Sequence, residues 1–278
     1  RPGIYLAPFY ASYGLAAAVI AVALLVRRLL GNDRQPLLWF KSTWPIEEFF
    51  SRLIGALPFL LAWPVFMAGF TAIKNLWNET LPFVWDQDIV ALGAKLPFST
   101  QLWHLIAFQN PPVTRAIEFV YAFWGVPLVA VPFMICLRPP TCPKRTRYLI
   151  SQLLVMILLG NVAAGAFMSA GPFWLDLTDP QGSPYATLLG YLQHIDPDGP
   201  FSATLFQRYL WDAYQHRIAW FGSGISAFPS IHVAVAALYV LAGWPFGGIA
   251  RATSAFFLGV IMIGSVHLGW HYAFDGYA

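Results

Sequence analysis

The chain has 278 residues, of which 58% are hydrophobic and 17% aromatic, while only 10% carry a charge. Soluble domains average about 25% charged and about 45–50% apolar residues, so this composition excludes an ordinary soluble domain and a disordered chain. A net charge of +3 argues against nucleic-acid binding, and two cysteines are too few for a disulfide scaffold. We therefore expect an all-α, polytopic membrane helical bundle that forms one integral-membrane domain over residues 1–278.

Six apolar segments are expected to cross the membrane, because a spanning helix needs about 20 apolar residues. In chain order they are residues 8–26, 52–70, 117–137, 148–168, 231–244 and 252–266. Between them, residues 81–108 carry tryptophans and scattered charges that are typical of interfacial helices. Residues 171–224 form the longest polar segment and include an amphipathic stretch at 204–220. A connection of that length usually carries function.

The loop charges predict an orientation. With the N-terminus outside, one face collects ten basic and three acidic residues, and the other collects six basic and ten acidic residues, giving +7 and −4. The positive-inside rule then places the segment 171–224 on the non-cytoplasmic face. The basic run from Arg138 to Arg147 contributes most to this assignment.

The segment Gly224-Ile-Ser-Ala-Phe-Pro-Ser-Ile-His232 begins the fifth expected span. Pro229 and Ser230 are typical of a helix start, with Ser230 as the N-cap. The free N–H groups of a helix terminus bind anions such as phosphate, and His232 would lie beside them. The pattern is equally compatible with a simple helix cap and an interfacial histidine.

The segment Ser265-Val-His-Leu-Gly-Trp-His-Tyr-Ala-Phe-Asp275 follows the sixth expected span. His271 and Asp275 are four residues apart, so on a helix they would share a face. A carboxylate that binds one imidazole nitrogen leaves the other free for nucleophilic chemistry. The alternatives are a structural hydrogen bond and zinc ligation by His267, His271 and Asp275. Gly269 interrupts the helical pattern and argues against zinc, so we expect no metal.

Both segments fall on one membrane face, and together they resemble motifs of the type-2 phosphatidic acid phosphatase superfamily of lipid phosphatases and phosphotransferases. Ala-Phe-Pro-Ser-Ile-His232-Val-Ala is similar to its second motif. Gly-Trp-His271-Tyr-Ala-Phe-Asp275-Gly is similar to the His-Tyr-x-x-Asp third motif of its inositol phosphorylceramide synthase and sphingolipid synthase branch. Ser-Ala-Gly171-Pro172 stands in the place of the first motif. We accordingly treat residues 1–80 as N-terminal spans and residues 81–278 as the catalytic core.

The resemblance implies a mechanism that needs no cofactor. His271 would attack phosphorus and form a phosphohistidine, while Asp275 orients its ring. His232 would protonate the leaving group and then deprotonate the acceptor. Ser230 and the start of the fifth span would hold phosphate oxygens.

The chain departs from the family in its cations. Gly171-Pro172 supplies neither Lys nor Arg, and Ser265 stands where the family has an arginine six residues before its nucleophile. Other groups must meet the charge of the phosphate. The candidates on the expected face are Arg217, His267 and Arg208, each of which is also compatible with an ordinary interfacial or solvated role.

We therefore expect a lipid phosphotransferase that works on the non-cytoplasmic face. It would pass a phospho-headgroup from a phospholipid donor to a lipid alcohol of the ceramide or diacylglycerol type. A lipid phosphatase with water as acceptor would need the same residues. A transporter is less favoured, because its polar groups should lie at mid-depth within the spans. A helix that carries His271 and Asp275 should continue across the membrane, which predicts the start of a further, truncated span.

Overall fold

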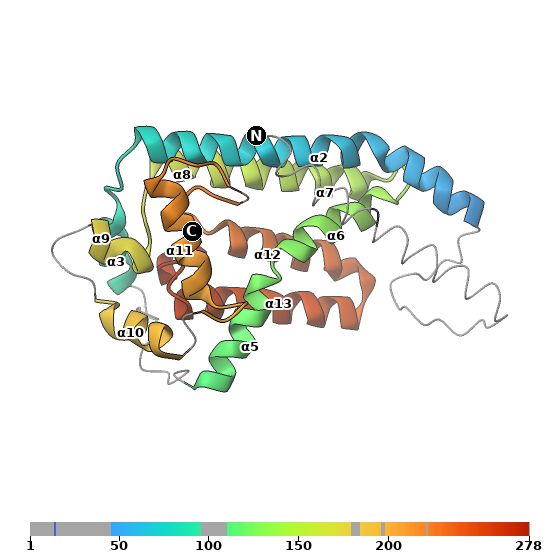
Figure 1. Ribbon diagram of the computed structural model, residues 1–278. Coiled ribbons are helices and arrows are strands. Elements are labelled where there is room, and N and C mark those ends of the chain that lie inside the picture. Colours follow the sequence, from blue (N-terminus) through green and yellow to red (C-terminus); the bar gives the residue numbers. More distant parts are fainter. Residues whose placement is uncertain are drawn as a thin grey trace.

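The computed structural model describes residue 14 and residues 46–95, 110–178, 184–195, 198–220 and 222–277. Within these ranges the regular elements are all helices, which confirms the all-α prediction for this part of the chain (Figure 1). The expected first span lies outside the described residues except for residue 14. Residues 96–108 of the expected interfacial stretch also lie outside them.

The helices follow one another with short connections. They are α2 (Ile46–Thr80), α3 (Asp86–Ala94), α5 (Pro111–Ala122), α6 (Gly125–Cys136), α7 (Pro143–Leu154), the π-helix η1 (Val155–Ala163), α8 (Ala164–Ala166), α9 (Pro172–Thr178), α10 (Ala186–Ile195), α11 (Ala203–Gln215), α12 (Ile231–Gly243), the 3-10 helix η2 (Trp244–Phe246), α13 (Gly248–His267) and the 3-10 helix η3 (Ala273–Gly276).

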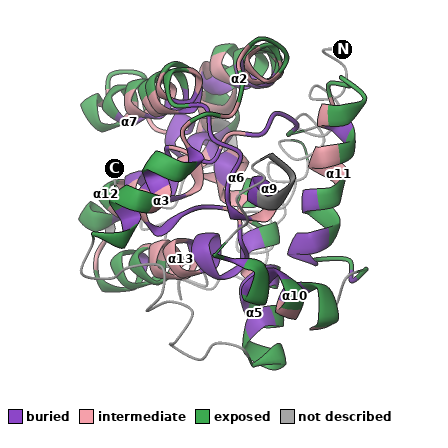
Figure 2. Ribbon diagram, turned by 90° about the vertical axis from the view of Figure 1, so that its left-hand side faces the viewer, coloured by how far each residue is buried: buried purple, intermediate pink, exposed green. Residues whose placement is uncertain are grey.

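Three helical stretches are long and apolar enough to cross a membrane, namely Glu48–Thr80, Pro143–Ala166 and Gly248–His267. The pair α5–α6 makes a fourth if it is counted as one bent span, whereas α12 is shorter. Large apolar side chains on these helices point outward; Val65 is 59% exposed and Phe256 is 71% exposed (Figure 2). Such surfaces are typical of helices that face lipid. The described residues thus support three or four spans of the expected six.

Two of the expected spans have different bounds in the structure. Helix α2 starts six residues before the predicted 52–70 segment and continues to Thr80. The segment predicted as one span over 117–137 begins at Pro111 and bends by 42° between α5 and α6. Pro127 explains the bend, because it has no N–H to donate and its ring clashes with the carbonyl of the preceding turn.

The helices pack as a bundle in which α2 lies along α7 and α8, while α12 and α13 form a hairpin crossed by α5 and α6 (Figure 1). Buried Trp63, Phe133, Met156 and Val235 bring α2, α6, η1 and α12 together. Close approach depends on small residues: a Cβ at Gly160 would lie 2.6 Å from the ring of Phe70.

The two ends of the bundle differ in charge and function. At one end the basic loop between α6 and α7 binds the start of α2, since Arg145 donates to the Gly55 carbonyl at 3.0 Å. At the other end, the last turns of α2 contact the segment before α12, where Asn78 donates to the Ile225 carbonyl at 2.7 Å. The motif histidines lie at this second end, away from the basic loop.

Candidate active site

Two histidines from distant parts of the chain meet at the second end of the bundle. His232 lies in the first turn of α12, and His271 lies in the turn that follows α13. Nε2 of His271 is 3.4 Å from Nδ1 of His232. The two rings pack edge to face, and both side chains line the same cavity. The sequence prediction that these side chains converge is therefore consistent with the geometry.

A backbone carbonyl fixes the tautomer of His271. Nδ1 of His271 lies 2.7 Å from the carbonyl oxygen of Ala227. A carbonyl oxygen can only accept, so Nδ1 must carry the proton, and Nε2 then holds the free electron pair. Ala227 is itself held by a hydrogen bond from its N–H to the Ser169 carbonyl at 2.9 Å. Sequence reasoning missed this acceptor, because a main-chain carbonyl has no residue signature.

Asp275 supports His271, but in a different geometry from the one expected. The prediction of a helix carrying His271 and Asp275 is wrong, because α13 ends at His267 and Asp275 lies in η3. Gly269 explains the ending: its φ of +71° is a left-handed conformation that favours glycine, and the N–H of Trp270 binds back to the Ser265 carbonyl. The expected onset of a further α-helical span at these residues is corrected in the same way.

The Asp275 carboxylate has two neighbours. Its Oδ2 lies 3.4 Å from Nδ1 of His271 and accepts the N–H of Tyr272 at 2.8 Å. Burial raises the pKa of Asp275, and the hydrogen bond and charge of His271 oppose this shift. The Ala227 carbonyl thus makes the shorter contact to the His271 ring, while Asp275 adds negative charge beside it and shapes the turn.

A third segment, 169–171, packs against both histidine-bearing segments. Gly171 has a φ of +101°, and a Cβ there would lie 2.9 Å from the Trp270 carbonyl oxygen and 3.1 Å from Cβ of Ala227. The buried carboxylate of Asp86 accepts the N–H groups of Ala170 and Gly171, each at 2.9 Å. It also accepts the Tyr272 hydroxyl at 2.7 Å. Asp86, which the sequence reading did not single out, therefore joins this segment to the turn that bears His271.

The other residues expected around phosphate lie in various places. The Ser230 hydroxyl accepts the N–H of Val233 at 3.4 Å and so caps α12. His267 is buried, with Nε2 2.9 Å from the Thr114 hydroxyl. Arg208 is exposed and pairs with Asp198 at 2.6 Å. Arg217 is exposed at a separate small polar cavity next to Asn75 and Asn78. Ser230, His267, Arg208 and Arg217 do not belong to the lining of the large cavity that holds the two histidines, as far as the described residues define it.

The expected amphipathic stretch forms helix α11, and part of the expected interfacial stretch forms α3. Phe206 and Tyr209 of α11 face the large cavity. Zinc ligation finds no support in the described ranges, where no group of three potential ligands is arranged around a common point. His267 binds Thr114, whereas His271 faces His232, so the two side chains serve different surroundings.

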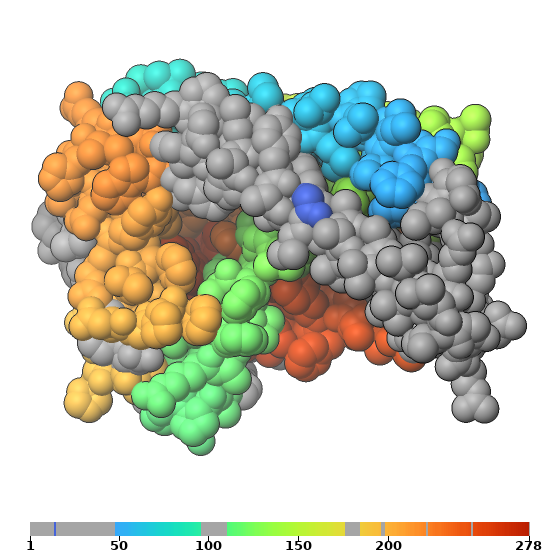
Figure 3. All heavy atoms as spheres, turned by 45° about the vertical axis from the view of Figure 1, so that its right-hand side comes forward, coloured from blue at the N-terminus to red at the C-terminus, as the bar shows by residue number. Residues whose placement is uncertain are grey.

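The cavity has a volume of about 1240 Å³ and two unlike ends. Figure 3 shows the surface hollowed between α5 and the segment of α10 and α11. One end, between α2, α6 and η1, is lined by apolar side chains that include Met67, Leu128 and Phe133. The other end carries the two histidines together with Lys74 of α2 and Glu118 of α5.

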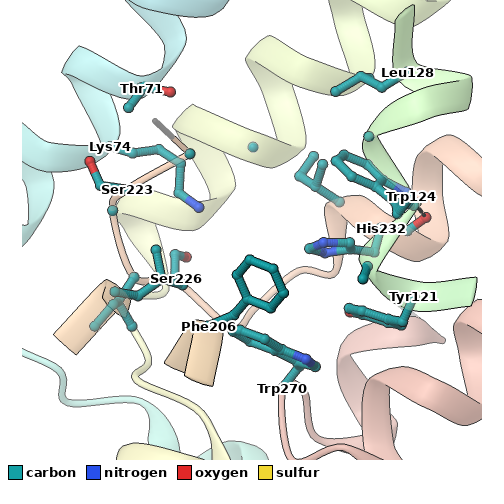
Figure 4. Close-up of a pocket in the computed structure, with 18 of the residues that line it drawn as sticks. Thr71, Lys74, Tyr121, Trp124, Leu128, Phe206, Ser223, Ser226, His232 and Trp270 are labelled. Atoms are coloured by element: carbon teal, nitrogen blue, oxygen red, sulfur yellow. Dashed lines mark hydrogen bonds between the residues drawn. The ribbon is translucent and has the colours of Figure 1, made fainter. Parts of the chain in front are cut away.

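Aromatic rings hold His232 in place. Its imidazole lies 4.3 Å from the ring of Trp124 and stacks on Tyr121 at 5.0 Å, measured between ring centroids. Trp124 also donates its indole N–H to the His232 carbonyl at 3.3 Å. Both aromatic residues stand at the bend between α5 and α6, so this bend positions the second histidine (Figure 4).

These features define a class of protein: a helical protein with membrane-type helices and a histidine pair at the polar end of a large, mainly apolar cavity. Comparison with protein-family models matches residues 87–278, more than two thirds of the chain, to the PAP2 superfamily. The chain belongs to this superfamily, and membership indicates an enzyme of the phosphatase or phosphotransferase type. The match does not single out the sphingolipid synthase branch. No curated protein and no solved structure matches the chain significantly.

Proposed function

We propose that this protein is a lipid phosphotransferase that moves a phospho-headgroup from a phospholipid donor to a lipid alcohol through a phosphohistidine at His271. One observation carries the proposal: Nδ1 of His271 is engaged by the Ala227 carbonyl at 2.7 Å, so Nε2 presents its electron pair beside His232. Family membership supports the reaction type.

In the first half-reaction Nε2 of His271 attacks the phosphorus of the donor. The bond from phosphorus to the diacylglycerol oxygen breaks, and the electron pair leaves with that oxygen. Protonated His232 gives its proton to the leaving oxygen, which releases diacylglycerol. The buried carboxylate of Asp275, 3.4 Å from Nδ1, balances the positive charge that develops on the phosphorylated imidazole.

In the second half-reaction the acceptor alcohol takes the place of diacylglycerol. His232, now neutral, removes the hydroxyl proton, and the alcohol oxygen attacks phosphorus. The bond to Nε2 breaks, which restores neutral His271 and leaves His232 protonated for the next cycle. Proton transfer by a positioned group of this kind contributes about 10²–10⁴-fold to a rate.

The cavity supports lipid substrates on both sides of the reaction. Its apolar end lies among helices long enough to cross a membrane, and its polar end carries the histidines. A lipid could therefore place its chains among Met67, Leu128 and Phe133 while its phosphate reaches Nε2 of His271. We place the reaction at the end of the bundle opposite the basic loop, which the loop charges assign to the non-cytoplasmic face.

The test uses the purified full-length chain in phospholipid nanodiscs that contain a donor labelled in its headgroup phosphate. Reactions are run with and without ceramide or diacylglycerol as acceptor. The proposal predicts a new labelled lipid that forms only with acceptor, and His271→Ala should abolish it. Release of water-soluble phosphate alone would refute the transferase and establish a phosphatase with the same histidines. Loss of neither product in His271→Ala would refute the mechanism.

A further inference from the structure

Lys74 brings a positive charge into the cavity from a helix outside the family match. It lies on α2, whereas the match begins at residue 87. Among the lining residues that the structure describes, Lys74 is the only lysine or arginine. Figure 4 shows its side chain pointing into the cavity on the side of Ser223 and Ser226, with His232 and Trp124 across from it.

The end of α2 is fixed to the segment that precedes α12. Asn75 donates to the Ser223 hydroxyl at 2.9 Å. Asn78 both accepts the N–H of Ile225 at 2.6 Å and donates to its carbonyl at 2.7 Å. Between them Gly224, with a φ of +98°, passes so close that a Cβ there would lie 2.7 Å from Cβ of Lys74. The direction of the Lys74 side chain is therefore set by backbone packing.

The electrostatic surroundings leave the Lys74 charge available to a ligand. No carboxylate lies within ion-pair distance of Lys74 in the described part of the chain. The one acidic side chain of the described lining, Glu118, accepts the N–H of Ala203 at 2.9 Å at the start of α11. Lys74 is close enough to His232 for their charges to interact. A cation in a mainly apolar cavity is costly unless an anion joins it.

We propose that Lys74 binds the phosphate of the substrate and meets the negative charge that develops on its oxygens during transfer. This inference rests on the proposed function and adds a substrate-binding residue to it. It answers the lack of cations in segment 169–172 and at Ser265, because the positive charge reaches the phosphate from α2 instead. A lysine binds phosphate as a point charge with three donors, which suits a group whose oxygens move during the reaction.

The expected effect is large, because a single donor aimed at developing charge contributes about 10²–10³-fold to kcat in other enzymes. Lys74→Met keeps the length and apolar stem of the side chain but removes the charge. It should lower kcat/KM by about 10²-fold, and Lys74→Arg should recover most of the loss. Lys95→Met is the matched control, since Lys95 is exposed at the end of α3 and does not line the cavity.

Two readouts test the inference on the purified full-length chain. The first is headgroup transfer in nanodiscs, and the second is calorimetric binding of orthovanadate, an analogue of the phosphoryl transition state that needs no turnover. We expect Lys74→Met to bind orthovanadate at least tenfold more weakly than wild type, and Lys95→Met to bind it normally. Thermal unfolding monitors the fold, and Lys74→Gln replaces the methionine variant if that variant does not fold.

The outcomes separate the two proposals. If Lys74→Met keeps wild-type orthovanadate affinity and kcat/KM, the inference is overturned, and Lys74 serves only to anchor α2. A wild type that binds no orthovanadate overturns it too. If binding depends on Lys74 but the wild type transfers no headgroup, the phosphate site stands and only the proposed reaction fails.

Discussion

Gly171→Ala is the sharpest probe of how the three segments around His271 fit together. The new Cβ would lie 2.9 Å from the Trp270 carbonyl oxygen and 3.1 Å from Cβ of Ala227. Both neighbours are backbone-fixed and belong to the segments that position His271. A non-glycine residue at a φ of +101° adds strain of about 1–3 kcal/mol. Relief of the contacts must displace Trp270 or Ala227 by at least a few tenths of an ångström.

Overpacking of this kind costs about 1–3 kcal/mol, so with the backbone strain the free energy of unfolding should fall by about 2–5 kcal/mol. Because misplacement of reacting groups by 1 Å can cost about 10²-fold, the displaced imidazole should lower turnover by about tenfold. Thermal unfolding in detergent and headgroup transfer in nanodiscs measure the two effects.

Gly190→Ala is the control for this experiment. Gly190 lies in α10 with open space around it, so alanine should leave stability unchanged or raise it by less than about 1 kcal/mol. If Gly171→Ala were as stable and as active as Gly190→Ala, the tight packing of segment 169–171 against the His271 turn would be refuted.

Three further variants probe the groups around His271. Tyr272→Phe removes the hydroxyl that donates to Asp86 at 2.7 Å, so the free energy of unfolding should fall by about 1–3 kcal/mol; an unchanged melting temperature would contradict the role of Asp86 as a joint. His232→Gln should lower turnover by about 10²–10⁴-fold while the fold is kept, and full activity would exclude His232 as the proton carrier. Burial raises the pKa of Asp275, so its carboxylate is protonated, and its support of His271 lost, at a higher pH than for an exposed aspartate. Because its pKa is higher in the folded than in the unfolded state, ionised Asp275 costs stability that returns as the pH falls through the folded-state pKa. Asp275→Asn should therefore remove this acidic limb from the pH–rate profile without a charge-related loss of stability; a variant that kept the wild-type limb would contradict the assignment.

The sequence predicted the helices well where long apolar runs dominate. The α12 and α13 segments match the expected fifth and sixth spans within a few residues, because their apolar character changes abruptly at both ends. The bend between α5 and α6 was missed, although Gly125 and Pro127 are residues that favour one. Its consequence, the placement of Tyr121 and Trp124 against His232, depends on tertiary packing that no local pattern encodes.

The candidate site was predictable in its residue types but not in its geometry. The motif patterns led to His232, His271 and Asp275, and these side chains do meet. The assumed helix through His271 failed because Gly269 closes α13, and a glycine just after the last apolar turn is a known stop signal. The Ala227 carbonyl and Lys74 could not be found in this way. One is main chain, and the other reaches the site only because α2 continues past its expected end and packs against Gly224.

The central claim is that His271 carries the phospho-headgroup between the two lipids. It is tested most directly by mixing the wild-type chain with a phosphate-labelled donor in the absence of acceptor, quenching at alkaline pH, and locating the label by mass spectrometry of peptides. The account predicts an acid-labile adduct on Nε2 of His271 that disappears when ceramide or diacylglycerol is added. An active enzyme whose label lies on another residue, or that forms no adduct before acceptor is added, would contradict it.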